Sequence, residues 1–260
     1  MDFWGTTDMP ALLHLRPFAF PAVLLAALEW WARTAGANSD ALAPPTLAAQ
    51  AFARALRDGS LLSATAFTLG SAAIGLALAS VLALGLGTML GLSRRAASAS
   101  FLSVEVLRPI PSVALIPLAM LVYGFGLRME ISVISFACFW PMLVLTQAAV
   151  QQVEPRLLEV SMALQLGSWA RFVKLVLPAI VPRLFIALRL GVAIALVVAV
   201  TVEIAANPNG MGYALMIAQQ SLDPALMLAW LFWIGLVGWC TNALALRLQS
   251  AVARRMGDLA

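Results

Sequence analysis

Residues 64–92 read ATAFTLGSAAIGLALASVLALGLGTMLGL, a stretch without a single charged side chain. A helix needs about 20 mostly apolar residues to cross the roughly 30 Å hydrocarbon core of a bilayer, and this stretch is long enough. Small residues recur along it and let neighbouring helices approach closely in lipid. They are Gly70, Ser71, Gly75, Ser80, Gly85, Gly87 and Gly91. The stretch therefore predicts a membrane-spanning helix that packs closely against others.

The composition of the whole chain agrees with a membrane protein. Of its 260 residues 62% are hydrophobic and 11% are charged, and the mean hydropathy is +0.94. Soluble domains average about 45–50% apolar and about 25% charged residues. A single soluble core of this size cannot bury such an excess, which excludes a soluble enzyme and a disordered chain. The apolar runs are continuous rather than alternating, so they indicate helices and not a β-barrel.

The chain is predicted to be all-α and polytopic, with about six transmembrane helices. The expected spans are about 17–35, 64–92, 101–124, 130–150, 183–205 and 225–246. We expect a single domain over 1–260, with a core at about 61–246. Three prolines, Pro109, Pro111 and Pro117, predict that the third span is broken or kinked. An amphipathic piece from Leu47 to Leu62 predicts a short helix on the membrane surface.

The distribution of basic residues predicts the orientation of the spans. With the N-terminus inside, the inner side receives Arg16, Arg94, Arg95, Arg108, Arg156, Arg171, Lys174, Arg183, Arg189, Arg247, Arg254 and Arg255, and the outer side Arg33, Arg54, Arg57 and Arg128. Cytoplasmic loops of membrane proteins carry the excess of Lys and Arg. Both termini are therefore expected in the cytoplasm. The same distribution explains the net charge of +4 without a nucleic-acid partner.

Residues for catalysis or metal binding are scarce. The chain has one histidine, His14, and two cysteines, Cys138 and Cys240, inside apolar runs. These residues form neither a metal site nor a disulfide framework nor a paired catalytic constellation. The Gly-x-x-x-x-Gly-Lys-Ser/Thr loop that cradles nucleotide phosphates is also missing. We expect a protein that is not an enzyme and binds no cofactor itself.

Residues 151–182 differ from the spans because charged residues alternate there with apolar ones. This pattern predicts two short amphipathic helices rather than a span. Gly167 is expected to end the first helix in a left-handed conformation, and Ser168 to cap the second. Pro178 and Pro182 are expected to interrupt the chain before the fifth span.

The same segment resembles the cytoplasmic "EAA" loop of permease subunits of ATP-binding-cassette (ABC) importers. That loop has Glu-Ala-Ala, a glycine six residues after the glutamate and a proline nineteen residues after it. Here Glu159 is followed by Val160-Ser161, and Pro178 stands at the family's proline position. Gln165 stands at the glycine position, so the turn is expected to be displaced toward Gly167.

Other stretches resemble the nitrate/sulfonate/taurine branch of these permeases. They are Pro44-Pro45, Arg108 to Pro117, Tyr123 to Gly126, and Glu203 with Asn207 to Tyr213. The resemblance implies a permease homodimer in the bacterial inner membrane, with two ATP-binding subunits that carry ATP and Mg. It also implies a periplasmic or lipid-anchored solute-binding protein that delivers a small organic or inorganic anion. The phosphate-binding chemistry would then belong wholly to the partner subunits.

The resemblance also suggests site residues. Those expected to couple the chain to an ATP-binding subunit are Glu159, Ser161, Ala163, Gln165, Gly167, Ser168, Trp169, Phe172 and Pro178. Candidates for the solute pathway or its gate are Ser112, Tyr123, Thr146, Gln147, Thr201, Glu203 and Asn207. An intramembrane carboxylate such as Glu203 is costly and is either functional or a structural acceptor. An ion-coupled secondary transporter is the alternative, and Glu203 and Glu29 are the carboxylates considered for it.

Overall fold

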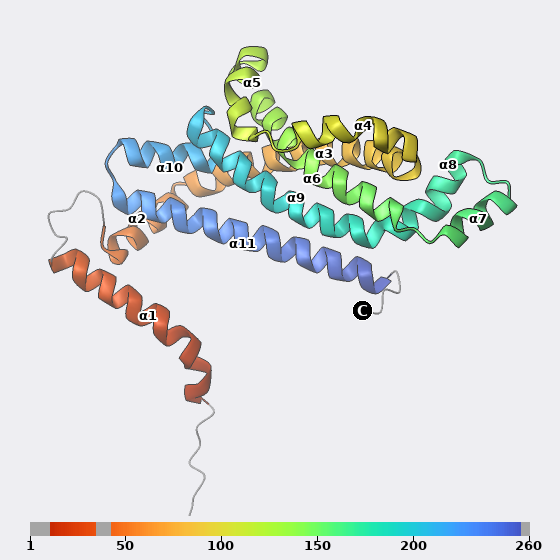
Figure 1. Ribbon diagram of the computed structural model, residues 1–260. Helices are drawn as coiled ribbons and strands as arrows, with labels where there is room; N and C mark the ends of the chain where they lie inside the picture. The colour runs from red at the N-terminus through yellow and green to blue at the C-terminus, as the bar shows by residue number, and fades with distance from the viewer. Residues whose placement is uncertain (1–10, 35–42, 256–260) are drawn as a thin grey trace, which may run out of the picture.

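The computed structural model describes residues 11–34 and 43–255, and the elements within these ranges are all helical. Four helices are long and apolar enough to cross a membrane: α3 (Ser60–Leu92), α6 (Leu127–Gln151), α9 (Leu177–Ala205) and α11 (Pro224–Arg255). They run alongside one another as an elongated bundle (Figure 1). The second, fourth, fifth and sixth predicted spans are thereby confirmed.

The small residues of α3 form its contact with α6. A Cβ atom added at Gly87 would lie 2.7 Å from Cβ of Thr146, and one added at Gly91 would lie 2.5 Å from Cβ of Val150. Real Cβ atoms do not approach each other so closely. Ser135 Oγ of α6 also donates a hydrogen bond to the Gly75 carbonyl oxygen at 3.0 Å. The two helices therefore pack backbone to backbone, as small residues permit in lipid.

The third predicted span is broken, as its prolines indicated. Helix α4 (Arg94–Leu107) is followed by the short 3-10 helix η1 (Ser112–Leu115) and by α5 (Ile116–Tyr123). The two parts bend by 83°. Helix α5 projects to one side of the bundle in Figure 1, with Ile116 and Ala119 buried against the core. The prolines at 109 and 111 lie in the break, where a helix would need the N–H groups that proline lacks.

Helix α1 (Ala11–Thr34) confirms a helix at the first predicted span. Within the described residues it is not among the helices that meet the length and hydropathy of a span. In Figure 1 most of it lies apart from the bundle, and it contacts α2 (Pro45–Arg57).

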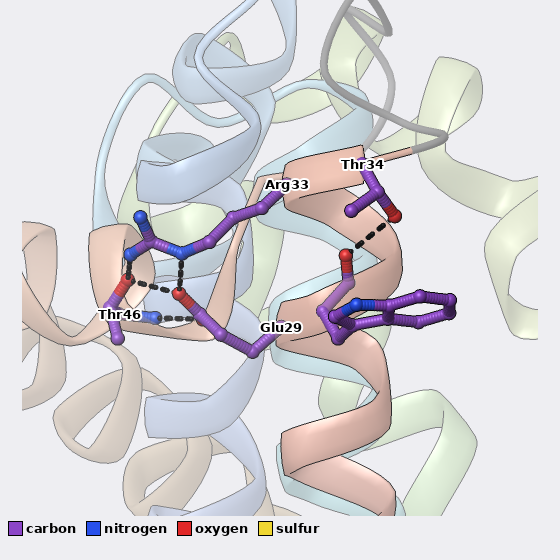
Figure 2. A network of polar contacts seen from close by, with 5 residues as sticks. Glu29, Arg33, Thr34 and Thr46 are labelled. Atoms are coloured by element: carbon purple, nitrogen blue, oxygen red, sulfur yellow. Dashed lines mark hydrogen bonds and ion pairs between the residues drawn. The ribbon is translucent and has the colours of Figure 1, made fainter.

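A polar network joins α1 to α2, as Figure 2 shows. Glu29 Oε2 accepts a hydrogen bond from the Thr46 backbone N–H at 3.0 Å, and Glu29 Oε1 accepts one from Thr46 Oγ1 at 2.8 Å. Arg33 pairs with Glu29 and donates to Thr46 Oγ1 at 2.9 Å. Glu29 thus caps one free N-terminal amide of α2, that of Thr46, from another helix.

The surface helix predicted to reach Leu62 ends earlier. Helix α2 ends at Arg57, and a turn with Gly59 at φ +78° starts α3. Asp58 Oδ1 accepts a hydrogen bond from the Ser60 N–H at 2.9 Å. That bond from the Ser60 backbone lowers the pKa of the Asp58 carboxyl. Leu61, fully buried, already belongs to the bundle core.

The expected interruption before the fifth span is wrong. The helix α8 (Ser168–Arg171) continues through a π-helical turn, η2 (Phe172–Val176), directly into α9. In this turn the Leu177 N–H bonds to the Phe172 carbonyl five residues back. A proline ring clashes with the carbonyl four residues before it. The wider turn relieves this clash at Pro178, and Pro182 is accommodated inside α9.

The short helix α10 (Gly210–Gln220) closes the end of the bundle where α9 ends and α11 begins (Figure 1). It packs against both of these helices and against α3. Met211, Ala218 and Trp230 are buried there in one apolar cluster. At the opposite end of the bundle the chain forms α7 (Pro155–Ala163) and α8.

Candidate functional site

A cluster of buried polar side chains lies at the α10 end of the bundle. Its members are Thr68, Ser71, Glu130, Glu203 and Asn207, each 0% or 1% exposed. They come from α3, α6, α9 and the turn after α9. Buried polar groups are costly unless they are hydrogen-bonded. The partners of the two carboxylates therefore decide what this buried polar cluster can do.

Glu130 is held by donors from two other elements. Ser71 Oγ of α3 donates to Glu130 Oε1, and Asn207 Nδ2 donates to Glu130 Oε2. Both carboxylate oxygens are thus engaged by groups of the chain itself. The side chain fastens the turn after α9 to the α3–α6 pair.

Glu203 is held by the first turn of α10. Its Oε2 accepts a hydrogen bond from the Gly212 N–H at 2.8 Å. A Cβ atom at Gly210, where φ is +90°, would lie only 2.0 Å from Glu203 Oε1. Next to it, Thr68 Oγ1 accepts a hydrogen bond from the Met211 N–H at 3.0 Å. Glu203 and Thr68 thus accept hydrogen bonds from two of the free N-terminal amides of α10.

These contacts favour the structural interpretation of Glu203 that the sequence left open. Glu203 and Asn207, both pathway candidates, do lie together, but they are buried and bonded to their own chain. Glu130, Thr68 and Ser71 were missed. The available signal was Glu130, a carboxylate in the otherwise apolar run of α6, because intramembrane carboxylates are rare and have partners.

The remaining pathway candidates are dispersed. Ser112 and Tyr123 lie on η1 and α5, where Tyr123 is 53% exposed. Thr146 is buried against Gly87 at the α3–α6 contact. Gln147 lines a groove of about 200 Å³ beside α4. Thr201 Oγ1 donates to the Val197 carbonyl of its own helix at 2.7 Å.

The chain makes a helical elbow at the other end of the bundle, residues 155–176. Helix α7 ends in a Schellman motif, in which the Leu166 N–H bonds to the Ser161 carbonyl at 3.0 Å. The left-handed residue of this motif is Gln165, at φ +52°. The prediction that Gly167 would be left-handed and that the turn would be displaced is therefore wrong. The turn stands where the importer pattern has its glycine, with glutamine in that place.

Most of the predicted coupling residues are exposed on this elbow. Trp169 is 76% exposed, and its ring lies 5.9 Å from that of Phe172. Leu164, beside the turn, is 64% exposed. Glu159, Ala163 and Gln165 of the elbow are also exposed, as is Pro178 at the start of α9. Ser161 is buried, Gly167 precedes α8, and Ser168 is the first residue of α8.

The fold and these two regions define a class of protein. It is a polytopic helical membrane domain with a buried polar cluster at one end and an exposed helical elbow at the other. Residues 75–258 match the family described as "Binding-protein-dependent transport system inner membrane component", and the chain belongs to it. The family is the permease component of ABC transporters, and the resemblance seen in the sequence is confirmed.

Several relatives support this assignment. An ABC transporter permease protein of Methanocaldococcus jannaschii is 34% identical over 186 residues, 70% of this chain and 69% of the relative. The aliphatic sulfonates transport permease protein SsuC of Bacillus subtilis is 26% identical over 229 residues, 88% of this chain and 83% of the relative. The nitrate import permease protein NrtB of Leptolyngbya laminosa is 27% identical and covers 72% of this chain and 67% of the relative.

Solved structures have the same fold. A chain of the MetNI methionine ABC transporter in an inward-facing conformation superimposes with a TM-score of 0.62 at 20% identity, over 71% of this chain and 92% of that chain. A chain of an amino acid ABC transporter gives a TM-score of 0.62 at 15% identity, over 78% and 98%. This protein is a permease subunit of an ABC importer.

Proposed function

We propose that this permease acts as a homodimer with two ATP-binding subunits, which bind ATP and Mg and hydrolyse ATP. A solute-binding protein delivers a small anion of the sulfonate, taurine or nitrate kind to it from outside. The names of the relatives SsuC and NrtB support this solute class. The whole chain forms one domain in the inner membrane of a bacterium, and both termini are cytoplasmic.

The observation that carries the proposal is the exposed elbow. The continuous helix from Trp169 to Ala205 has 37 residues and is about 55 Å long. Since the hydrocarbon core is about 30 Å thick, several turns must lie outside it. Trp169 and Leu164 then present apolar area to water, which marks an interaction site.

Charge supports the orientation of the elbow. Arg156, Arg171 and Lys174 lie on the elbow, and Arg94 and Arg95 lie at the same end of the bundle. The positive-inside rule favours the cytoplasm for this end. There the two short helices fit a groove on the ATP-binding subunit, and Glu159 sets their orientation by charge.

Capture of the ATP-binding subunit from the same transporter tests this docking. Trp169→Ala removes the most exposed aromatic ring of the elbow. Its matched control is Trp239→Ala, which removes a ring 67% exposed on α11, away from the elbow. Hot-spot aromatic residues contribute about 2 kcal/mol or more to binding, so Trp169→Ala is expected to weaken capture by about thirtyfold and the control by less than about threefold. Equal capture of the ATP-binding subunit by both variants would show that Trp169 of the elbow does not contribute to the interface.

A further inference from the structure

An apolar groove lies between α3, α9 and α11. It has a volume of about 260 Å³. Its lining includes Leu69, Ala73 and Leu76 of α3, Val192 and Leu196 of α9, and Leu248 of α11. Helix α11 is the least enclosed of the four apolar helices, with 17% of its apolar stretch buried. The groove is therefore open to the hydrocarbon of the bilayer.

A basic side chain lies beside this groove. Arg189 of α9 precedes the lining residue Val192 by one turn, and its Nε donates to Asn242 Oδ1 of α11 at 3.3 Å. Along α9 it stands about 24 Å from Ala205, which puts it inside a hydrocarbon core that begins there. In the part of the chain that the structure describes, no carboxylate pairs with this guanidinium. An arginine in a membrane without a charged partner is costly.

The order of residues along the helices matches the order of groups in a phospholipid. The α9 residues that line the groove all lie further from the elbow than Arg189 does, and so nearer the middle of the bilayer. On α11 the exposed Arg247 directly precedes Leu248, which lines the elbow end of the groove. Both cations thus lie toward the elbow along their helices, and the apolar groove extends inward from their level.

We infer that the groove binds one phospholipid with an anionic headgroup. The headgroup phosphate accepts hydrogen bonds from Arg189, which extends its long side chain toward the surface, and is attracted by Arg247. One acyl chain fills the groove. The lipid supplies the negative charge that Arg189 lacks within the chain, and it joins α11 to α3 and α9.

Native mass spectrometry of the purified full-length chain, titrated with phosphatidylglycerol or phosphatidylethanolamine, tests this site. One phosphatidylglycerol per chain is expected, bound at least about tenfold more tightly than phosphatidylethanolamine. Arg189→Gln should abolish the preference. Arg183→Gln, the control on the same helix, should keep it, because Arg183 bonds to the Ala149 carbonyl away from the groove. Equal binding of phosphatidylglycerol by wild type and Arg189→Gln would overturn the inference.

A second variant tests the groove without changing any charge. Ala73→Phe places a ring in the groove from an exposed position of α3, and Ala77→Phe places one a turn further on, outside the lining. Only the first should lose the bound lipid. Soluble glycerol phosphate should not compete, because it has no acyl chain. Competition by glycerol phosphate would reduce the site to a simple anion site and contradict the inference. If Ala73→Phe kept the lipid but separated two copies of the chain, the groove would instead belong to a dimer contact.

Discussion

Glu203 Oε2 accepts a hydrogen bond from the Gly212 backbone N–H at 2.8 Å, and this bond connects the end of α9 to the start of α10. The contact lies at the end of the bundle opposite the elbow (Figure 1). The polar side chains at this end are buried, whereas Trp169 and Leu164 of the elbow at the other end are exposed. Movement of the elbow would move α9 as well, because the helix is continuous from Trp169 to Ala205, next to the buried polar cluster.

Replacing Glu203 by alanine should destabilise the α10 end. The change leaves the buried Gly212 N–H without its acceptor, which costs about 1–3 kcal/mol. Thermal unfolding in detergent measures this loss. Glu105→Ala is the control, because Glu105 forms an exposed pair with Arg108 at 3.7 Å that contributes little. Equal losses of thermal stability in the two variants would contradict a stabilising role of the Glu203–Gly212 hydrogen bond.

The α3–α6 contact should distinguish two glycines of the same helix. Gly91→Ala would put a Cβ 2.5 Å from Val150, so the helices must separate, and we expect a loss of about 1–3 kcal/mol. Gly85→Ala meets nothing within 4 Å and should be neutral or stabilising by up to about 1 kcal/mol. Melting temperatures of both variants check the sign. A stabilised Gly91→Ala variant would contradict the packing described for α3 and α6.

The turn of the elbow should be stabilised by glycine. Gln165 holds a left-handed conformation, which costs a non-glycine residue about 1–2 kcal/mol. Gln165→Gly removes this cost, whereas the β-branched Gln165→Val increases it. Hydrogen exchange at the Leu166 amide, which bonds to Ser161, should slow about fivefold in the glycine variant. Unchanged exchange in both variants would mean that position 165 is not strained.

The two ends of the bundle should label from opposite sides of the membrane. Single cysteines at Asn209 and at Gly167, both exposed, are introduced after Cys138 and Cys240 are replaced by serine. An impermeant thiol reagent added from outside should reach position 209 and not 167. Labelling of position 167 from outside would reverse the proposed orientation and separate the elbow from any cytoplasmic partner.

Much of the fold was predictable because the apolar runs are long. The small residues of 64–92 indicated a close helix contact, and the structure pairs them with α6. The prolines after Leu107 indicated the 83° break correctly. The helix break predicted at Pro178 and Pro182 was wrong. A π-helical turn before Pro178 lets the helix continue, and no sequence pattern marks such a turn.

The site residues were harder to predict, since their partners are distant in sequence. Glu203 could be recognised as an intramembrane carboxylate. Its contact with Gly212 and its position near Thr68 could not be predicted, because they depend on how α10 packs against α3 and α9. Glu130 pairs with Ser71, 59 residues away, and with Asn207, 77 residues away. The left-handed residue was expected at Gly167, because glycine adopts that conformation most easily. The chain adopts it at Gln165 instead.

The most direct test of the central claim is solute uptake into proteoliposomes. The permease is reconstituted with its ATP-binding subunit and solute-binding protein, and radiolabelled taurine and nitrate are the probes. We predict accumulation that requires ATP and the binding protein. It should be lost in Glu159→Lys, which reverses a charge on the elbow, and kept in Trp239→Ala. Uptake driven by a proton or sodium gradient, without the ATP-binding subunit, would contradict the account and identify an ion-coupled transporter.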